Sequence, residues 1–208
     1  MSPRAYHLGR RQEQVDESRR RVITAARGLL AETTRYSSFT VDAVATRADV
    51  ARATVYYQFQ SKTGLLEALC DALAEIGRMS DLALAFSLAD PIDAVSAFIA
   101  SFGRFWAVDR LVMRRLRSLA ALDDEVSLVI AARDQRRRSG LEVLVSRANH
   151  RGLLAIEAAR ALPMLVALSS FETFDALATP DQPLDEVTPE VLEMARVVWR
   201  SVEESGGR

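Results

Sequence analysis

The stretch from residue 40 to residue 66, TVDAVATRADVARATVYYQFQSKTGLL, constrains the fold of this chain more than any other. Thr40 can cap a helix through its hydroxyl, and apolar residues then recur at spacings of three and four. Asp49 stands where the chain must turn, since Asp tolerates left-handed backbone angles better than most residues. A second, short helix follows over residues 51–58, and Ser61 can cap a third. The spacing therefore predicts a helix-turn-helix.

The second of these helices carries side chains suited to nucleic acid. Arg52 and Thr54 lie near its start, where side chains can reach base edges, and arginine prefers guanine O6 and N7. Tyr56 and Tyr57 add phenolic hydroxyls, which can bond to phosphates. Lys62, the only lysine of the chain, begins the next helix.

This run resembles the DNA-binding signature of the tetracycline-repressor (TetR) family of bacterial transcription regulators, over roughly residues 18–70. The residues that match the signature are Thr40, Val44, Ala45, Ala48, Val50, Thr54, Tyr56, Phe59, Lys62, Leu65 and Leu66. The resemblance implies a homodimer held by a four-helix bundle of the last two helices. A two-fold dimer can place two recognition helices in successive major grooves of a palindromic operator.

The resemblance also implies which residues contact DNA. Thr40 and the amino end of its helix meet a phosphate through free backbone N–H groups. Arg52 and Thr54 reach base edges, while Tyr57 and Lys62 donate to phosphates.

Three neighbouring residues have other assignments. Tyr56 and Phe59 fall on the inner face of their helix by spacing, so we expect them in the core and Tyr57 on the DNA side. Arg47 either contacts DNA or is solvated, and the sequence leaves both open.

The sequence departs from the family signature at Asp49, Ala53, Gln58 and Gly64. Gly64 stands where an acidic residue normally closes a capping box with Ser61. We therefore expect the start of that helix to be weaker by about 1 kcal/mol. The changes at Ala53 and Gln58 leave the operator sequence open.

The distribution of charge supports a DNA-binding amino-terminal third. Residues 1–65 hold 11 basic and 6 acidic residues, a net of +5, and residues 66–208 hold 16 and 22, a net of −6. We expect a mobile basic arm over residues 1–15, a helix-turn-helix domain over residues 16–65 and a regulatory and dimerisation domain over residues 66–208. The arm either tracks DNA or is a disordered terminus.

The rest of the chain predicts helices throughout, and hence an all-α fold of about nine helices. The first is expected to start near residues 16–18 and end near residue 33. Beyond the helix-turn-helix, the expected helices cover residues 61–80, 90–108, 110–122, 123–150, 156–178 and 188–202. Pro163 is expected to kink the 156–178 helix or delay its start, and Gly152 to stop the one before it.

Two sets of residues in this carboxy-terminal part are candidates for binding. An effector pocket implied by the resemblance is assigned to Phe98, Phe102, Trp106, Met113, Arg117, Met164, Phe171, Phe174 and Asp175, although helical cores look the same in sequence. A dimer interface is assigned to Leu165, Leu168, Phe171, Val191, Ala195, Val198 and Trp199, because helices apolar on several faces must be covered.

The sequence argues against several other kinds of protein. It has no Gly-rich phosphate loop, nucleophile motif or metal-ligand cluster, so we expect no enzyme, cofactor or metal. Cys70 is the only cysteine and is expected to be buried and inert, and residues 136–138 form a basic run expected on a solvated face. With no signal peptide or membrane span in the sequence, a cytoplasmic location is expected.

The leading hypothesis is a dimeric repressor that a small molecule releases from double-stranded operator DNA. The alternatives are a DNA-binding regulator without a ligand and, far behind, an enzyme that uses a cavity in the carboxy-terminal part.

Overall fold

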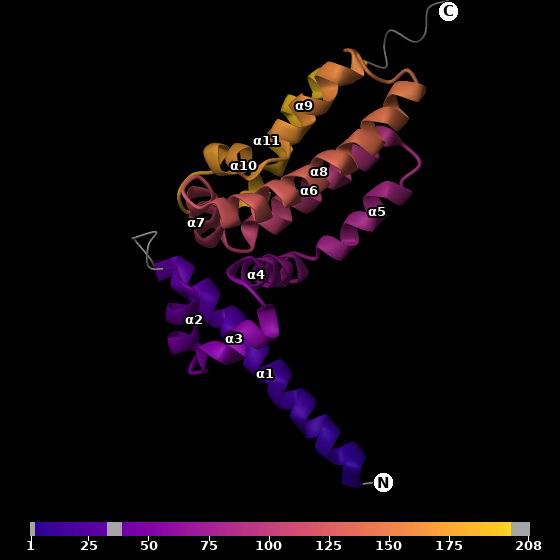
Figure 1. Cartoon of the computed structure of the whole chain (residues 1–208). Helices are drawn as coiled ribbons and strands as arrows, with labels where there is room; N and C mark the ends of the chain where they lie inside the picture. The colour runs from indigo at the N-terminus through magenta and orange to yellow at the C-terminus, as the bar shows by residue number, and fades with distance from the viewer. Residues whose placement is uncertain (1–2, 33–38, 201–208) are drawn as a thin grey trace, which may run out of the picture. The chain divides into compact units, whose positions relative to one another are not determined.

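The structure is a computed structural model that describes the backbone of residues 3–32 and 39–200 and the side chains of residues 13–32 and 39–200. The described residues form helices α1 to α11 with short 3₁₀ turns and no strand, so the predicted all-α class is confirmed (Figure 1). Backbone contacts divide the chain into two compact units, Met1–Ala72 with Arg114–Ile130, and Leu73–Met113 with Ala131–Arg208. This division differs from the boundary expected after residue 65, because parts of two later helices belong to the first unit.

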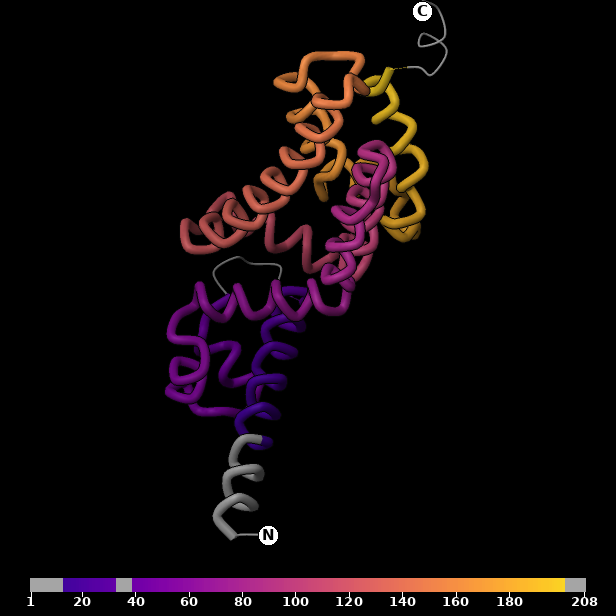
Figure 2. The backbone as a smooth tube through the Cα atoms, turned by 90° about the vertical axis from the view of Figure 1, so that its right-hand side faces the viewer, coloured from indigo at the N-terminus to yellow at the C-terminus, as the bar shows by residue number. Residues whose placement is uncertain are grey.

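The first unit is built on α1 (Pro3–Glu32), α2 (Val41–Ala48), α3 (Arg52–Phe59) and most of α4 (Lys62–Ile76) (Figure 2). Its core joins one apolar stripe from each helix, and the fully buried members are Val22, Ala26, Val44, Leu65, Leu66 and Leu69. Burial of such stripes at about 25 cal/mol per Å² is what holds these short helices together.

The start of α1 differs from the prediction, which placed it near residue 16. The helix begins at Pro3, since proline suits a first turn and Arg, Gln and Glu in the following residues favour helix. The side chains of residues 3–12, and residues 1–2 altogether, lie outside the described residues. The arm and its contact with DNA therefore stay predictions.

Three predicted helices of the middle of the chain are confirmed nearly to the residue. They are α6 (Pro91–Ala107), α7 (Arg110–Ala120) and α8 (Asp124–His150). Asp90 caps α6 by accepting a hydrogen bond from the N–H of Ile92 at 2.8 Å, and Gly152 ends the α8 region with a φ of 67°. One short helix, α5 (Leu82–Ser87), was not expected.

The prediction of a single helix over residues 156–178 is wrong, because the structure has two helices there, α9 (Ala158–Leu168) and α10 (Phe171–Leu177). Pro163 lies inside α9 and does not mark the break. Buried Ser169 is held by two long-range bonds: its carbonyl accepts from Trp106 Nε1 at 3.1 Å, and its hydroxyl accepts from Arg137 at 2.7 Å. Ser170 then caps α10 by accepting from the N–H of Thr173 at 3.3 Å.

Residues 136–138 were expected on a solvated face, and this prediction is wrong for Arg137. Its side chain is buried, and its guanidinium donates to the carbonyl of Val166 as well as to Ser169. A buried guanidinium needs such acceptors, so Arg137 is a structural residue that joins α8 to the end of α9.

The last helix, α11 (Thr188–Ala195), is shorter than the expected 188–202 span. After the 3₁₀ turn Arg196–Val198 the backbone becomes extended, and Trp199 forms an isolated antiparallel bridge with Leu154. The N–H of Ala155 donates to the carbonyl of Val198 at 2.9 Å. This pairing gives the backbone groups partners that a longer helix would otherwise supply.

The core of the second unit is centred on α6, which contacts α5, α10, α11 and the 3₁₀ turn Leu184–Val187. The contact with α10 is close at Gly103, where a Cβ atom would lie 2.8 Å from the ring of Phe174. Glycine is therefore required there.

Candidate nucleic-acid interface

The turn between α2 and α3 has the geometry that the sequence predicts. Thr40 is extended and its hydroxyl accepts from the N–H of Ala43 at 3.1 Å, which caps α2. Asp49 is left-handed, with φ 53° and ψ 53°, and the next N–H, from Val50, donates to the carbonyl of Ala45 at 3.1 Å. The N–H of Ala43 is taken by Thr40, and the N–H groups of Val41 and Asp42 before it have no acceptor within the helix, which is the arrangement that can bind an anion.

The outer face of α3 carries most of the residues predicted to read DNA. Arg52 and Tyr57 are exposed, with Tyr57 at 81%, and Thr54 is partly exposed. The opposite face buries Val55 and Phe59 in the core of the unit. An apolar inner face thus leaves the polar side chains of one short helix turned to solvent.

Tyr56 is not the core residue that its spacing suggested, since it is 40% exposed. Its hydroxyl lies 3.3 Å from Arg52 Nη2, and the guanidinium carbon of Arg52 lies 5.3 Å from the centre of its ring. On the other side, Arg52 forms an ion pair with Asp42 of α2. The Tyr56 hydroxyl and the Asp42 carboxylate both raise the pKa of Arg52.

Several contacts join α3 to α1, and none was expected from the sequence. The Gln58 amide donates to the hydroxyl of Ser18 at 3.1 Å. Arg19 donates to the carbonyl of Gln58 at 3.2 Å, and its guanidinium carbon lies 4.5 Å from the centre of the Phe59 ring. These contacts fix the carboxyl end of α3, and Gln58 thereby has a structural role.

Lys62, predicted to meet a phosphate, is bound to another residue in the structure. Its ammonium group forms an ion pair with Asp123, and the two side chains are 22% and 25% exposed. Asp123 also accepts from the N–H groups of Glu125 and Val126, so it caps α8. The hydrogen bond from Lys62 is the largest cause that lowers the pKa of Asp123.

Gly64 has a steric role at the start of α4 that the lost capping box did not predict. Ser61 still accepts from the N–H of Gly64 at 3.0 Å. A Cβ atom at Gly64 would lie 2.1 Å from the carbonyl oxygen of Phe59, which itself accepts from the N–H of Ser61 at 2.8 Å. Glycine is required at this turn, and the acidic residue of a capping box would not fit.

Arg47, for which two roles were open, pairs with Glu32 of α1 through two hydrogen bonds of 2.6 Å. These bonds raise the pKa of Arg47 and lower that of Glu32. The arginine is therefore neither freely solvated nor unpaired, and a DNA phosphate would have to compete with Glu32 for it.

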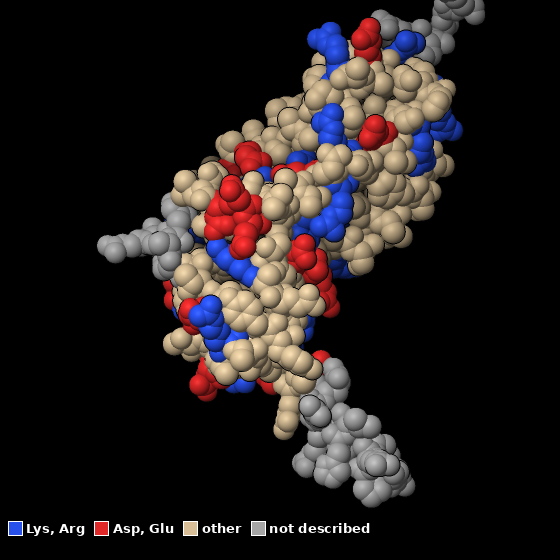
Figure 3. Space-filling model, viewed as in Figure 1, with Lys and Arg blue, Asp and Glu red and all other residues tan. Residues whose placement is uncertain are grey.

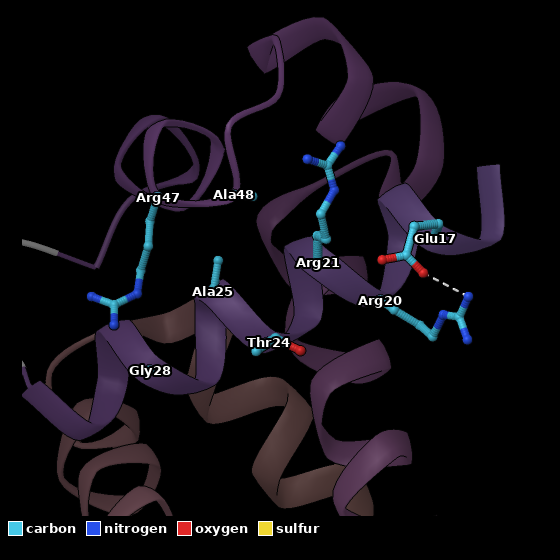
Figure 4. A pocket seen from close by; sticks show the side chains of 8 residues that line it. All are labelled: Glu17, Arg20, Arg21, Thr24, Ala25, Gly28, Arg47 and Ala48. Atoms are coloured by element: carbon cyan, nitrogen blue, oxygen red, sulfur yellow. Dashed lines mark hydrogen bonds and ion pairs between the residues drawn. The ribbon is translucent and has the colours of Figure 1, made fainter. Parts of the chain in front are cut away.

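Beside this pair, α1 and α2 line an open groove of about 540 Å³ (Figure 4). Its charged lining residues are one acid, Glu17, and three arginines, Arg20, Arg21 and Arg47, and Glu17 accepts a hydrogen bond from Arg20. Basic and acidic side chains are interspersed on the face of the molecule that Figure 3 shows.

The aromatic residues predicted for an effector pocket come together in the second unit. Ring centres are 5.0 Å apart for Phe98 and Phe102, 5.7 Å for Phe102 and Trp106, and 5.8 Å for Trp106 and Phe171. These rings are buried, as are Met113 and Phe174, while Met164 is partly exposed.

The two charged residues of the predicted pocket have other surroundings. Asp175 accepts from Arg110 Nε at 2.6 Å. Arg117 belongs to the first compact unit and not to the unit that holds the rings. Whether any of the predicted residues binds an effector stays a prediction.

The residues predicted for the dimer interface are mostly core residues of the single chain. Leu165, Phe171, Val191, Ala195 and Val198 are buried within the single chain, and only Leu168 and Trp199 are partly exposed. The exposed apolar side chains near these helices are others, namely Leu177, Met194 and Val197.

A helix-turn-helix that turns an arginine, a threonine and a tyrosine outward from a short second helix is the fold of a DNA-binding regulator. Residues 22–69 match the family of bacterial regulatory proteins of the tetR type. The predicted resemblance is thereby confirmed over residues 22–69, which lie in the first unit.

Solved structures extend the likeness in fold to most of the chain. The TetR-family transcriptional regulator PfmR from Thermus thermophilus is 22% identical, with a TM-score of 0.62 over 86% of this chain and 99% of that one. NalD of Pseudomonas aeruginosa, the secondary repressor of the MexAB-OprM multidrug efflux pump, is 21% identical, with a TM-score of 0.65 over 91% and 99%. The transcriptional regulator FadR from Bacillus subtilis, solved with stearoyl-CoA, is 18% identical, with a TM-score of 0.62 over 84% and 96%. No curated protein matches the chain significantly.

The described part of the chain lacks the features of two other kinds of site. It has no helix with the length and apolar composition needed to cross a membrane. Among the same residues, no group of three His, Cys, Asp or Glu side chains could hold a metal ion.

Proposed function

We propose that this protein is a homodimeric transcription repressor that binds a palindromic DNA operator through α3 and the amino end of α2, and that a small molecule releases it. The observation that carries the proposal is the outer face of α3, where Arg52, Thr54 and Tyr57 are at least partly exposed beside the capped start of α2. Arginine and threonine can bond to base edges, and tyrosine to phosphate.

The release by a small molecule is supported by the composition of the second unit. Its aromatic cluster offers the apolar lining that ligand sites of proteins usually have. FadR from Bacillus subtilis was solved with stearoyl-CoA, which is an example of a ligand for this fold. We infer for this chain a small molecule with a substantial apolar part, acting in the cytoplasm.

A footprint on the DNA upstream of the protein's own coding sequence tests the proposal. Protection of a palindrome that spans two successive major grooves supports a dimer that reads DNA. Titration of small molecules against this footprint then tests release. Protection that no compound relieves favours a regulator without a ligand, and no protection on any duplex contradicts the proposal.

A further inference from the structure

The acidic residue Asp42 lies on the surface that is proposed to read DNA. Asp42 is in the first turn of α2, two residues after Thr40, and its side chain is 60% exposed. A carboxylate close to DNA phosphates opposes binding to every sequence. We therefore expect Asp42 to have another role at this surface that compensates for this repulsion.

The carboxylate of Asp42 holds the arginine that is proposed to read a base. Asp42 Oδ2 accepts from Arg52 Nη1 at 3.1 Å, and Arg52 Nε lies 3.1 Å from Asp42 Oδ1. The other terminal nitrogen, Nη2, donates to the hydroxyl of Tyr56 at 3.3 Å. The guanidinium is thus held at both terminal nitrogens, by one residue of α2 and one of α3.

These contacts leave part of the guanidinium available. A guanidinium has five N–H bonds, of which one on Nη1 donates to Asp42 and one on Nη2 donates to Tyr56. Each of these two nitrogens carries a second N–H bond. Arginine bonds to O6 and N7 of guanine with two of its N–H bonds.

Stability does not account for the Asp42–Arg52 pair. Both side chains are 60% exposed, and ion pairs in water contribute little to folding. An arginine free in solvent, however, loses rotamer entropy when it docks on a base. A partner that fixes the guanidinium beforehand lowers this cost for the geometry that suits guanine.

We propose that Asp42 is a specificity-determining residue that positions Arg52 for a guanine and, by its own charge, weakens binding to other sequences. The inference rests on the proposed DNA-binding function and adds a residue that its signature does not contain. Specificity is the difference between the affinity for the preferred sequence and the affinity for other sequences. Asp42 favours the preferred sequence by positioning Arg52, and its negative charge weakens binding to the other sequences.

Asp49 provides a matched control for the charge of Asp42. It is an exposed acidic residue of the same helix-turn-helix, and Asn tolerates its left-handed φ of 53°. Asp42→Asn and Asp49→Asn each remove one negative charge, but only the first removes the ionic partner of Arg52.

The experiment selects bound sequences from a pool of random duplexes with the full-length wild type, D42N, D49N, R52A and the D42N/R52A double variant. We expect the wild type to select guanine at one position of each half-site, and R52A to lose this preference. D42N should lower the guanine preference about tenfold, the order expected for one bidentate contact, while D49N keeps it. Both single Asp variants should bind random DNA more tightly.

The double variant separates positioning from a general effect, because D42N should change nothing further where Arg52 is absent. Thermal unfolding of D42N should match that of the wild type, so that a change in the selected sequences does not come from a loss of stability. A D42N protein that keeps the guanine preference overturns the inference alone, and so does a D42N substitution that changes the selected sequences equally with and without Arg52. A wild type that selects no sequence overturns the proposed function as well.

Discussion

Lys62 at the start of α4 and Asp123 at the cap of α8 form an ion pair inside the first compact unit. The lysine implied as a phosphate contact is therefore already bound to a carboxylate. A phosphate and Asp123 would compete for one ammonium group, since each needs its charge at hydrogen-bond distance.

Asp123→Asn should strengthen binding to DNA of any sequence, because it releases Lys62 while an Asn can still cap α8. Measured by salt titration, the slope of log K against log salt should steepen by about one if Lys62 gains a phosphate. Lys62→Ala should give a shallower slope. The double variant should behave like Lys62→Ala, and an Asp123→Asn effect that persists without the lysine would refute the competition.

The ion pair between Lys62 and Asp123 should make the free energy of unfolding depend on pH in the acid range. Lys62 lowers the pKa of Asp123 in the folded protein, so the stabilisation is fully present above the unfolded value, about 3.9. It is lost as pH falls through the lower folded pKa. The difference in unfolding free energy between wild type and Asp123→Asn should thus be constant near neutral pH and shrink below about pH 4. A difference that instead changes between about pH 6 and pH 8, where His titrates, would implicate other groups.

Gly64→Glu would complete a capping box by sequence, yet it should destabilise the protein. The Cβ atom would meet the carbonyl oxygen of Phe59 at 2.1 Å, and overpacking typically costs about 1–3 kcal/mol. Chemical denaturation of Gly64→Glu and Gly64→Ala measures this cost. Equal losses for both point to the Cβ atom, whereas a gain for the glutamate would restore the capping-box interpretation.

The local signals of the sequence were sufficient for the helix-turn-helix, because a cap at Thr40 and a left-handed Asp49 depend on neighbouring residues. The requirement for glycine at position 64 was missed, since it depends on where the carbonyl of Phe59 points. Contacts over long sequence distances were also inaccessible. The helix that periodicity predicted as continuous is interrupted at Ser169, whose carbonyl accepts from Trp106, and the partner of Lys62 lies 61 residues away.

Arg110 should be among the most important charged residues for the stability of the second unit. It pairs with Asp175 at 2.6 Å and donates to the carbonyls of Asp175, Ala178 and Thr179, which end α10. Removing one partner of a largely buried pair costs about 3 kcal/mol, so Arg110→Ala should unfold at clearly lower denaturant. Arg196→Ala, which breaks the exposed pair with Glu193, should change stability by less than about 1 kcal/mol.

The proposed dimer should depend on the exposed side chains near the last helices and not on the buried residues first assigned to it. Val197 is 57% exposed, whereas Val191 is fully buried in its own subunit. Val197→Asp places a charge on a surface that a partner would cover, so it should give a folded monomer in sedimentation velocity. Val191→Ala should lower the unfolding free energy by about 1–3 kcal/mol, as cavity-forming substitutions do, with the dimer retained at low temperature. A dimer unaffected by Val197→Asp would place the interface on another face of the protein.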